Sequence, residues 1–103
     1  MALRARFTEE ITVSSSAIGI TSTNLEDSSG RTLSVHMATF QLASGGDIHT
    51  NPLNTPVAGD GDDNKRTVTN LWEVWGSDDL KNFQMVKQTG EDDAKVVVHG
   101  YGS

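Results

Sequence analysis

The acidic run Asp60–Asn64 has the residue types that begin a calcium-binding loop. Carboxylate and amide oxygens are the ligands that Ca²⁺ prefers, but an EF-hand loop also needs a glycine at its sixth position and a carboxylate at its twelfth. Lys65 and Leu71 occupy those positions here. The run therefore predicts a solvated acidic loop, as do Asp92 and Asp93, with an irregular calcium site as the alternative.

The histidines and hydroxyl residues form no catalytic or metal-binding pattern. His36, His49 and His99 lie far apart in the chain, without the short spacing that is typical of metal ligands. Ser14–Ser16 has no neighbouring base, and the absence of cysteine excludes disulfides, thiolate zinc sites and a cysteine nucleophile. No nucleophile elbow, phosphate loop or paired-carboxylate motif is present. We therefore expect no enzyme, no catalytic residue, no metal and no cofactor.

The aromatic residues allow one binding hypothesis. Trp72, Trp75 and Tyr101 would suit a platform on which sugars stack. However, the chain has only two tryptophans, one tyrosine and three phenylalanines, and the core of the domain needs most of them. Packing in the core and at its rim is thus the preferred interpretation, and a stand-alone glycan-binding module is the alternative.

Length and charge narrow the class of protein. A chain of 103 residues forms one domain. At this size it buries only about two-thirds of its unfolded surface, so that oligomerisation would stabilise it. The net charge of −6 argues against binding to nucleic acid or to anionic membranes. No apolar run approaches the roughly 20 residues of a membrane span, and no signal peptide is evident, which indicates synthesis and folding in a cytoplasm.

The elements that position these residues are organised around Thr67–Tyr101. Alternation in this stretch places Trp72 and Val74 on one face, toward the core, and Trp75 on the other, at a rim. Ser77 is expected to cap a short helical turn. Leu80 and Phe83, which follow, are expected to plug the end of the sheet. Two further strand-like runs complete an expected antiparallel meander: Phe83–Lys87 and Ala94–Tyr101.

The N-terminal segment, residues 1–7, alternates between apolar and basic residues. This pattern predicts either an edge strand or an extended arm that reaches a neighbouring subunit. Its side chains are candidate interface residues: Leu3, Arg4, Arg6 and Phe7.

A strand is predicted over Arg31–Ala43, and a long loop follows it at residues 45–66. Both prolines and the acidic run fall in this loop, which is long for a compact domain and is therefore a place to expect contacts with another molecule. Ile48, Leu53 and Val57 are its apolar anchors and are further interface candidates.

These patterns predict an all-β fold: a single small antiparallel β-sandwich, of the jelly-roll or Ig-like kind, with an extended N-terminal arm and one long loop. The expected division is an arm or edge strand at residues 1–7 and a β-sandwich domain at residues 8–103, with the loop at 45–66. No helix of ordinary length is expected.

Most of the chain takes part in a recognisable order of features. They are, in sequence, Val13–Thr21, Arg31–Phe40, Leu42–Gly59, Leu71–Gly76, Leu80–Val86 and Ala94–Tyr101. This order resembles that of small structural proteins of tailed-bacteriophage virions, of the decoration, neck or tail accessory type. The insertion Asp60–Arg66 and the basic arm before Phe7 depart from the pattern and leave the position in the virion open.

The resemblance implies a non-enzymatic structural component of a virion, assembled in the host cytoplasm. Its partners would be a major capsid, portal/neck or tail protein, and it would form a homo-oligomer. Trp75, at the rim, joins the interface candidates.

Overall fold

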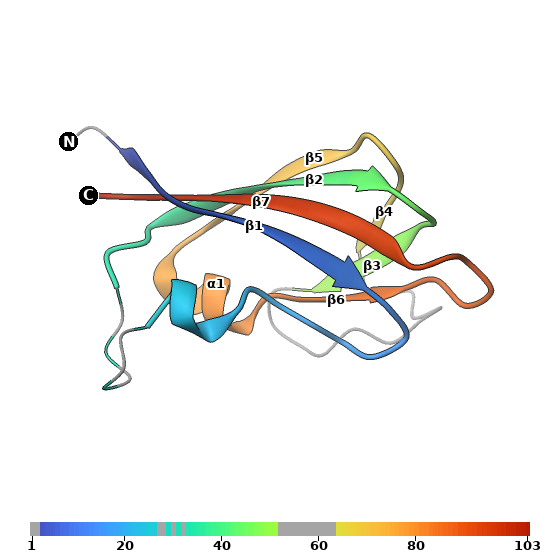
Figure 1. Ribbon diagram of the computed structural model, residues 1–103, viewed down its shortest axis with the longest axis horizontal. Helices are drawn as coiled ribbons and strands as arrows, with labels where there is room; N and C mark the ends of the chain where they lie inside the picture. Colours follow the sequence, from blue (N-terminus) through green and yellow to red (C-terminus); the bar gives the residue numbers. More distant parts are fainter. Residues whose placement is uncertain (1–2, 27–28, 30, 32, 52–63) are drawn as a thin grey trace.

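The computed structural model describes residues 3–26, 29, 31, 33–51 and 64–103. These residues form two antiparallel sheets (Figure 1). The four-stranded sheet contains, in spatial order, β1 (Arg4–Val13), β7 (Ala94–Gly102), β2 (Met37–Ser44) and β5 (Leu71–Trp75). The three-stranded sheet contains β4 (Asn64–Arg66), β3 (Ile48–Asn51) and β6 (Gln84–Lys87). Two short helical segments complete the elements: the 3-10 turn η1 (Ser22–Asn24) and the helix α1 (Ser77–Asn82).

The hydrophobic core follows the two-residue period of the strands. In β7, Ala94, Val96 and Val98 are fully buried, whereas Lys95 and His99 between and beside them are exposed. Successive side chains of a strand point to opposite faces of the sheet, so that one face of β7 supplies core and the other faces outward. The strand predicted over Ala94–Tyr101 is confirmed.

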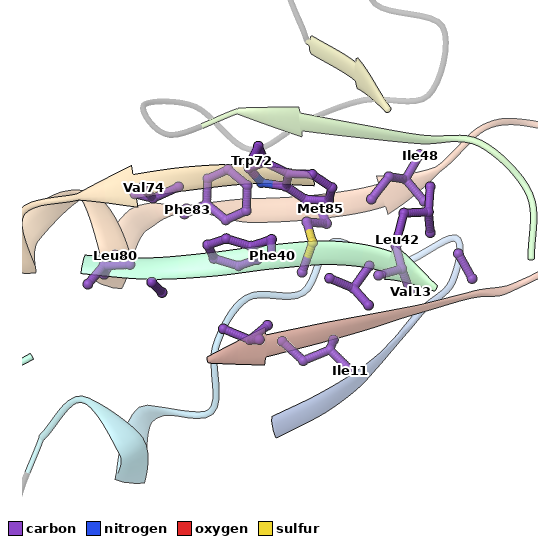
Figure 2. Close-up of a cluster of buried hydrophobic side chains, with 14 of the residues drawn as sticks. Ile11, Val13, Phe40, Leu42, Ile48, Trp72, Val74, Leu80, Phe83 and Met85 are labelled. Carbon is purple, nitrogen blue, oxygen red and sulfur yellow. The ribbon is translucent and has the colours of Figure 1, made fainter. Parts of the chain in front are cut away.

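An aromatic cluster forms the centre of the core (Figure 2). The rings of Phe40 and Trp72 are stacked, with centroids 5.5 Å apart and an interplanar angle of 6°. The Phe83 ring packs against Phe40 at 4.8 Å, tilted by 48°. Trp72 is 7% exposed and Trp75 56%, which confirms their predicted places in the core and at a rim. Leu80 and Phe83 are buried, as predicted.

The expected meander over Thr67–Tyr101 is wrong. Met37 of β2 pairs with Trp75 on one side and with Tyr101 on the other, so that β2 lies between β5 and β7. β6 belongs to the other sheet. The connections through α1 and through Gly90 each carry the chain from one sheet to the other, which is why neighbours in sequence are not neighbours in a sheet.

The predicted loop at 45–66 contains strands at both ends. Residues 48–50 pair with 64–66, and residues 48–51 also pair with β6. Ile48 is completely buried in the core. These strands are only four and three residues long and contain Asn and Lys, which are depleted in strands, so that their main-chain pairing is what reveals them. Leu53 and Val57 lie outside the described residues.

Two boundaries also differ from expectation. The strand predicted from Arg31 begins at Met37. The short helix is present, but Gly76 is its N-cap and no side chain caps it; Ser77 is already the first helical residue. Gly76 has a φ of +98°, a conformation that glycine adopts without the steric cost of a Cβ atom.

Candidate functional site

The strand β5 presents the most exposed apolar side chains among the described residues. Leu71 is 71% exposed and Trp75 56%, and both point outward because Trp72 and Val74 point into the core. Glu73 lies between them on the same face, and its Oε1 accepts a hydrogen bond from Trp75 Nε1 at 3.2 Å. We call Leu71, Glu73 and Trp75 the β5 outer strip. Alongside it, Thr39, Leu71, Trp72 and Glu73 line a shallow hollow of about 490 Å³.

The main chain of β5 has one paired side. Gly76 N–H donates to His36 O at 2.7 Å, and Leu42 N–H donates to Asn70 O at 3.1 Å. Hydrogen-bonded positions alternate along an antiparallel pair, so that even-numbered residues of this strand bond to β2. The amide and carbonyl groups of the β5 outer strip therefore face the other side, where the described residues place no further strand. Within the described part of the chain, β5 is thus an edge strand, and an edge strand is the part of a sheet that most readily pairs with another chain.

A cleft of about 340 Å³ borders the same strand. It is lined by Arg66, Trp72, Glu73, Val74, Trp75, Asp79 and Phe83. The strand contributes its residues from both faces, α1 contributes Asp79, and the end of β4 contributes the arginine. The cleft thus combines aromatic walls with one cationic and two carboxylate side chains.

The arginine of this cleft is held in place by an aromatic contact. Arg66 Cζ lies 4.8 Å from the centroid of the Trp72 ring, and Arg66 Nε donates to Thr50 Oγ1 at 3.4 Å. Burial disfavours the charged guanidinium and lowers the pKa of Arg66. Trp72 Nε1 is buried and has no hydrogen-bond partner in the described part of the chain. The faces of the Trp72 ring thus contact Phe40 and Arg66, while its one polar atom bonds to none of the described residues.

The N-terminal interface candidates lie on or beside the edge strand β1. Leu3 is 41% exposed, and Arg4 and Arg6 are exposed on the strand itself. Phe7 is half-buried and packs against the core, and a Cβ atom added to Gly100 would collide with its ring. Residues 4–7 are therefore continuous with β1, and the expected division after residue 7 falls inside this strand.

The other candidates are divided between surface and core. Trp75 is exposed in the β5 outer strip. Ile48 has no exposed surface, because its side chain fills the core between the sheets. Sequence reasoning did not select Leu71, Glu73 or Arg66. Leu71 and Glu73 share the outward face of β5 with Trp75, but only the fold shows that this strand lies at a sheet edge.

The three histidines take part in separate contacts. His99 Nδ1 lies 3.1 Å from Thr8 Oγ1, and His36 Nε2 lies 3.3 Å from Ser103 Oγ. His49 is buried and its Nε2 contacts Gln88 Oε1. Within the described ranges, no three His, Asp or Glu side chains gather as they would around a metal ion.

No protein-family model, curated protein or solved structure matches this chain. Among the described residues, no helix has the length and apolar character needed to cross a membrane.

Proposed function

We propose that this chain is a small β-sandwich, of the jelly-roll or Ig-like kind, that serves as a non-enzymatic structural component of a tailed-phage virion. In this proposal it binds a major capsid, portal/neck or tail protein as a decoration, cement or accessory subunit, and it acts as a homo-oligomer. The observation that carries the proposal is the β5 outer strip, in which Leu71 and Trp75 are exposed on a strand fixed by the core.

The physical support is the nature of these two side chains. Burial of apolar surface contributes about 25 cal/mol per Å². Tryptophan is among the residues that most often dominate the binding energy of protein interfaces. The opposite face of the same strand is anchored by Trp72 and Val74, so that a partner would meet a surface that is already ordered. Binding to a particle would in turn stabilise a small domain by mass action.

The direct test is binding to particles that lack the chain. The reading frames that neighbour its gene are examined for capsid, portal and tail proteins. Particles are produced from any that are found, and purified protein is sedimented with them. The variant Leu71→Ser/Trp75→Ser should lose at least about tenfold in affinity, because hot-spot residues contribute roughly 2 kcal/mol or more each. Its stability should change little, since both side chains are exposed.

A matched control is Ile18→Ser. Ile18 is 39% exposed and its main chain bridges to Met85, which places it beside the other sheet. This variant also removes an exposed apolar side chain, and it should bind as the wild type does. Equal binding by the wild type and the strip variant, or no binding by either, would contradict the proposal.

The cleft beside β5 favours glycan binding as a second candidate function. Sugar hydroxyls both donate and accept hydrogen bonds, and the cleft offers carboxylates on Glu73 and Asp79, a guanidinium on Arg66 and the exposed ring of Trp75. The alternative platform of Trp72, Trp75 and Tyr101 would need an exposed Trp72 ring, and Trp72 is buried in the core. A cleft with groups of both charges suits a neutral saccharide.

Fluorescence titration with soluble hexamers of β-1,4-linked glucose and N-acetylglucosamine tests this second function. Saturable quenching is expected, and Trp75→Phe should abolish it. Asp79→Asn should weaken binding by about tenfold or more, because a hydrogen bond to a charged group contributes roughly 1.5–3 kcal/mol. Asp92→Asn, an exposed acid that does not line the cleft, is the control. A signal that does not saturate, or that Trp75→Phe retains, would refute the glycan site.

A further inference from the structure

We propose that copies of this chain join head to tail, with the free edge of β5 in one copy paired to the free edge of β1 in the next. The four-stranded sheet would then continue from copy to copy. This inference rests on the proposed function for its setting, an assembly of many copies, whereas the contact itself follows from the two edges of the sheet.

The two strands are the outermost of the sheet, in the order β1-β7-β2-β5 (Figure 1). Gly76 and Asn70 bond to β2, so that the residues of the β5 outer strip direct three amides and three carbonyls away from β2. β1 spans Arg4–Val13, and among the strands of the described ranges it pairs only with β7. Main-chain hydrogen bonds of this kind supply affinity without any special side-chain motif.

The strand registers within the sheet fix the direction of the next copy's β1 and the residues of β5 that it would lie beside. Adjacent strands of the sheet are antiparallel throughout, so that β1 of the next copy would run antiparallel to β5. One row of the sheet contains Thr8, His99, Thr39 and Glu73. Another contains Ala5, Tyr101, Met37 and Trp75. Continuation without stagger places Thr8 of the next copy beside Glu73, and its Ala5 beside Trp75.

Charge complementarity selects this occupant. In the continued sheet, Arg4 and Arg6 of the next copy lie at the Trp75 end of β5, where α1 begins. The first turn of α1 contains Asp78 and Asp79, both exposed. Opposite charges therefore meet at the Trp75 end of the seam. A symmetric pairing of two β5 strands about Glu73 would instead set two carboxylates directly opposite each other, which destabilises a strand pair.

Cysteine cross-linking tests the contact, because the chain has no cysteine of its own. Paired antiparallel residues have Cα atoms about 4.5–5.5 Å apart, within the range that a disulfide spans. Single variants Thr8→Cys and Glu73→Cys are mixed under mild oxidation. Their mixed dimer should form at least about tenfold faster than that of the control pair Gln41→Cys and Glu73→Cys. Gln41 is exposed on the same sheet but lies on the inner strand β2.

Charge exchange separates a specific contact from a folding defect. Arg4→Glu/Arg6→Glu in the Thr8→Cys chain should reduce the mixed dimer at least about tenfold at low salt. Asp78→Lys/Asp79→Lys in the Glu73→Cys chain should restore it. Excess self-dimers of Glu73→Cys, a yield no higher than the control, or failure of the restoration would overturn the inference. Particle binding without this cross-link would refute the inference alone, and cross-linking without particle binding would refute the proposed function alone.

Discussion

Phe40→Ala is expected to lower the free energy of unfolding by about 3–5 kcal/mol, the usual cost of removing a fully buried phenylalanine. Phe40 has no exposed surface and contacts both other rings of the central cluster, at 5.5 Å from Trp72 and 4.8 Å from Phe83. Removal of its ring leaves a cavity in the core between the two sheets. Small domains are stable by only about 5–15 kcal/mol, so that this change is a large share of the total.

Urea unfolding followed by tryptophan fluorescence and by circular dichroism measures this loss. Leu71→Ala is the matched control, because Leu71 is 71% exposed and its truncation should change stability by no more than about 0.5 kcal/mol. Similar values for the two variants would mean that the aromatic cluster is not the centre of the core.

Gly45→Ala is the second substitution with a large expected effect. Gly45 has a φ of +94°, a region that costs a residue with a Cβ atom about 1–2 kcal/mol. An added Cβ would also lie 2.6 Å from Ala94 Cα, against a fixed main chain at the start of β7. Overpacking of this kind costs roughly a further 1–3 kcal/mol. The turn from β2 to β3 would have to shift, and with it the connection between the sheets.

Gly90→Ala separates the cost of the positive φ from the cost of the steric contact. Gly90 has a φ of +86°, but a Cβ atom added there would meet nothing within 4 Å. Only the backbone cost of about 1–2 kcal/mol is therefore expected at this position. Thermal unfolding of both variants should give a clearly larger loss for Gly45→Ala. Equal losses would contradict the close approach between the turn and β7.

The sequence predicted which side chains of the best-patterned strands are buried. In β5 and β7, apolar residues alternate with polar or rim residues, and a two-residue period leaves only one choice of core face. The burial of Trp72 and the exposure of Trp75 followed from this pattern. The short helix before Phe83 was also predicted, because acidic residues at its start complement the positive end of a helix.

The pairing of strands was not predictable in the same way. Alternation of apolar residues predicts which face of a strand is buried, but it does not predict which other strand pairs with that strand. The expected meander assumed that consecutive strands pair, and the connection through α1 instead crosses between sheets. The strand β3 was missed because Ile48 is its only apolar residue, so that a loop and a strand share the same pattern.

The candidate site was predictable only in part. Trp75 was selected from the end of an alternating run, and its exposure is confirmed. The importance of Leu71 and Glu73 depends on β5 being an edge strand, which follows from three-dimensional pairing with β2. Arg66 lines the cleft and contacts the Trp72 ring, and the spacing of these two residues in the sequence does not predict that contact.

The copy number of this chain in purified particles is the decisive measurement for a structural role in a virion. If the reading frames that neighbour its gene encode capsid, portal and tail proteins, particles assembled from them together with this chain are purified by sedimentation and quantified by mass spectrometry. The proposed function predicts a fixed copy number that matches a symmetry of the particle, and its loss with Leu71→Ser/Trp75→Ser. Particles without the chain would contradict the proposed function. So would an amount of chain that varies between preparations and is not changed by this double substitution.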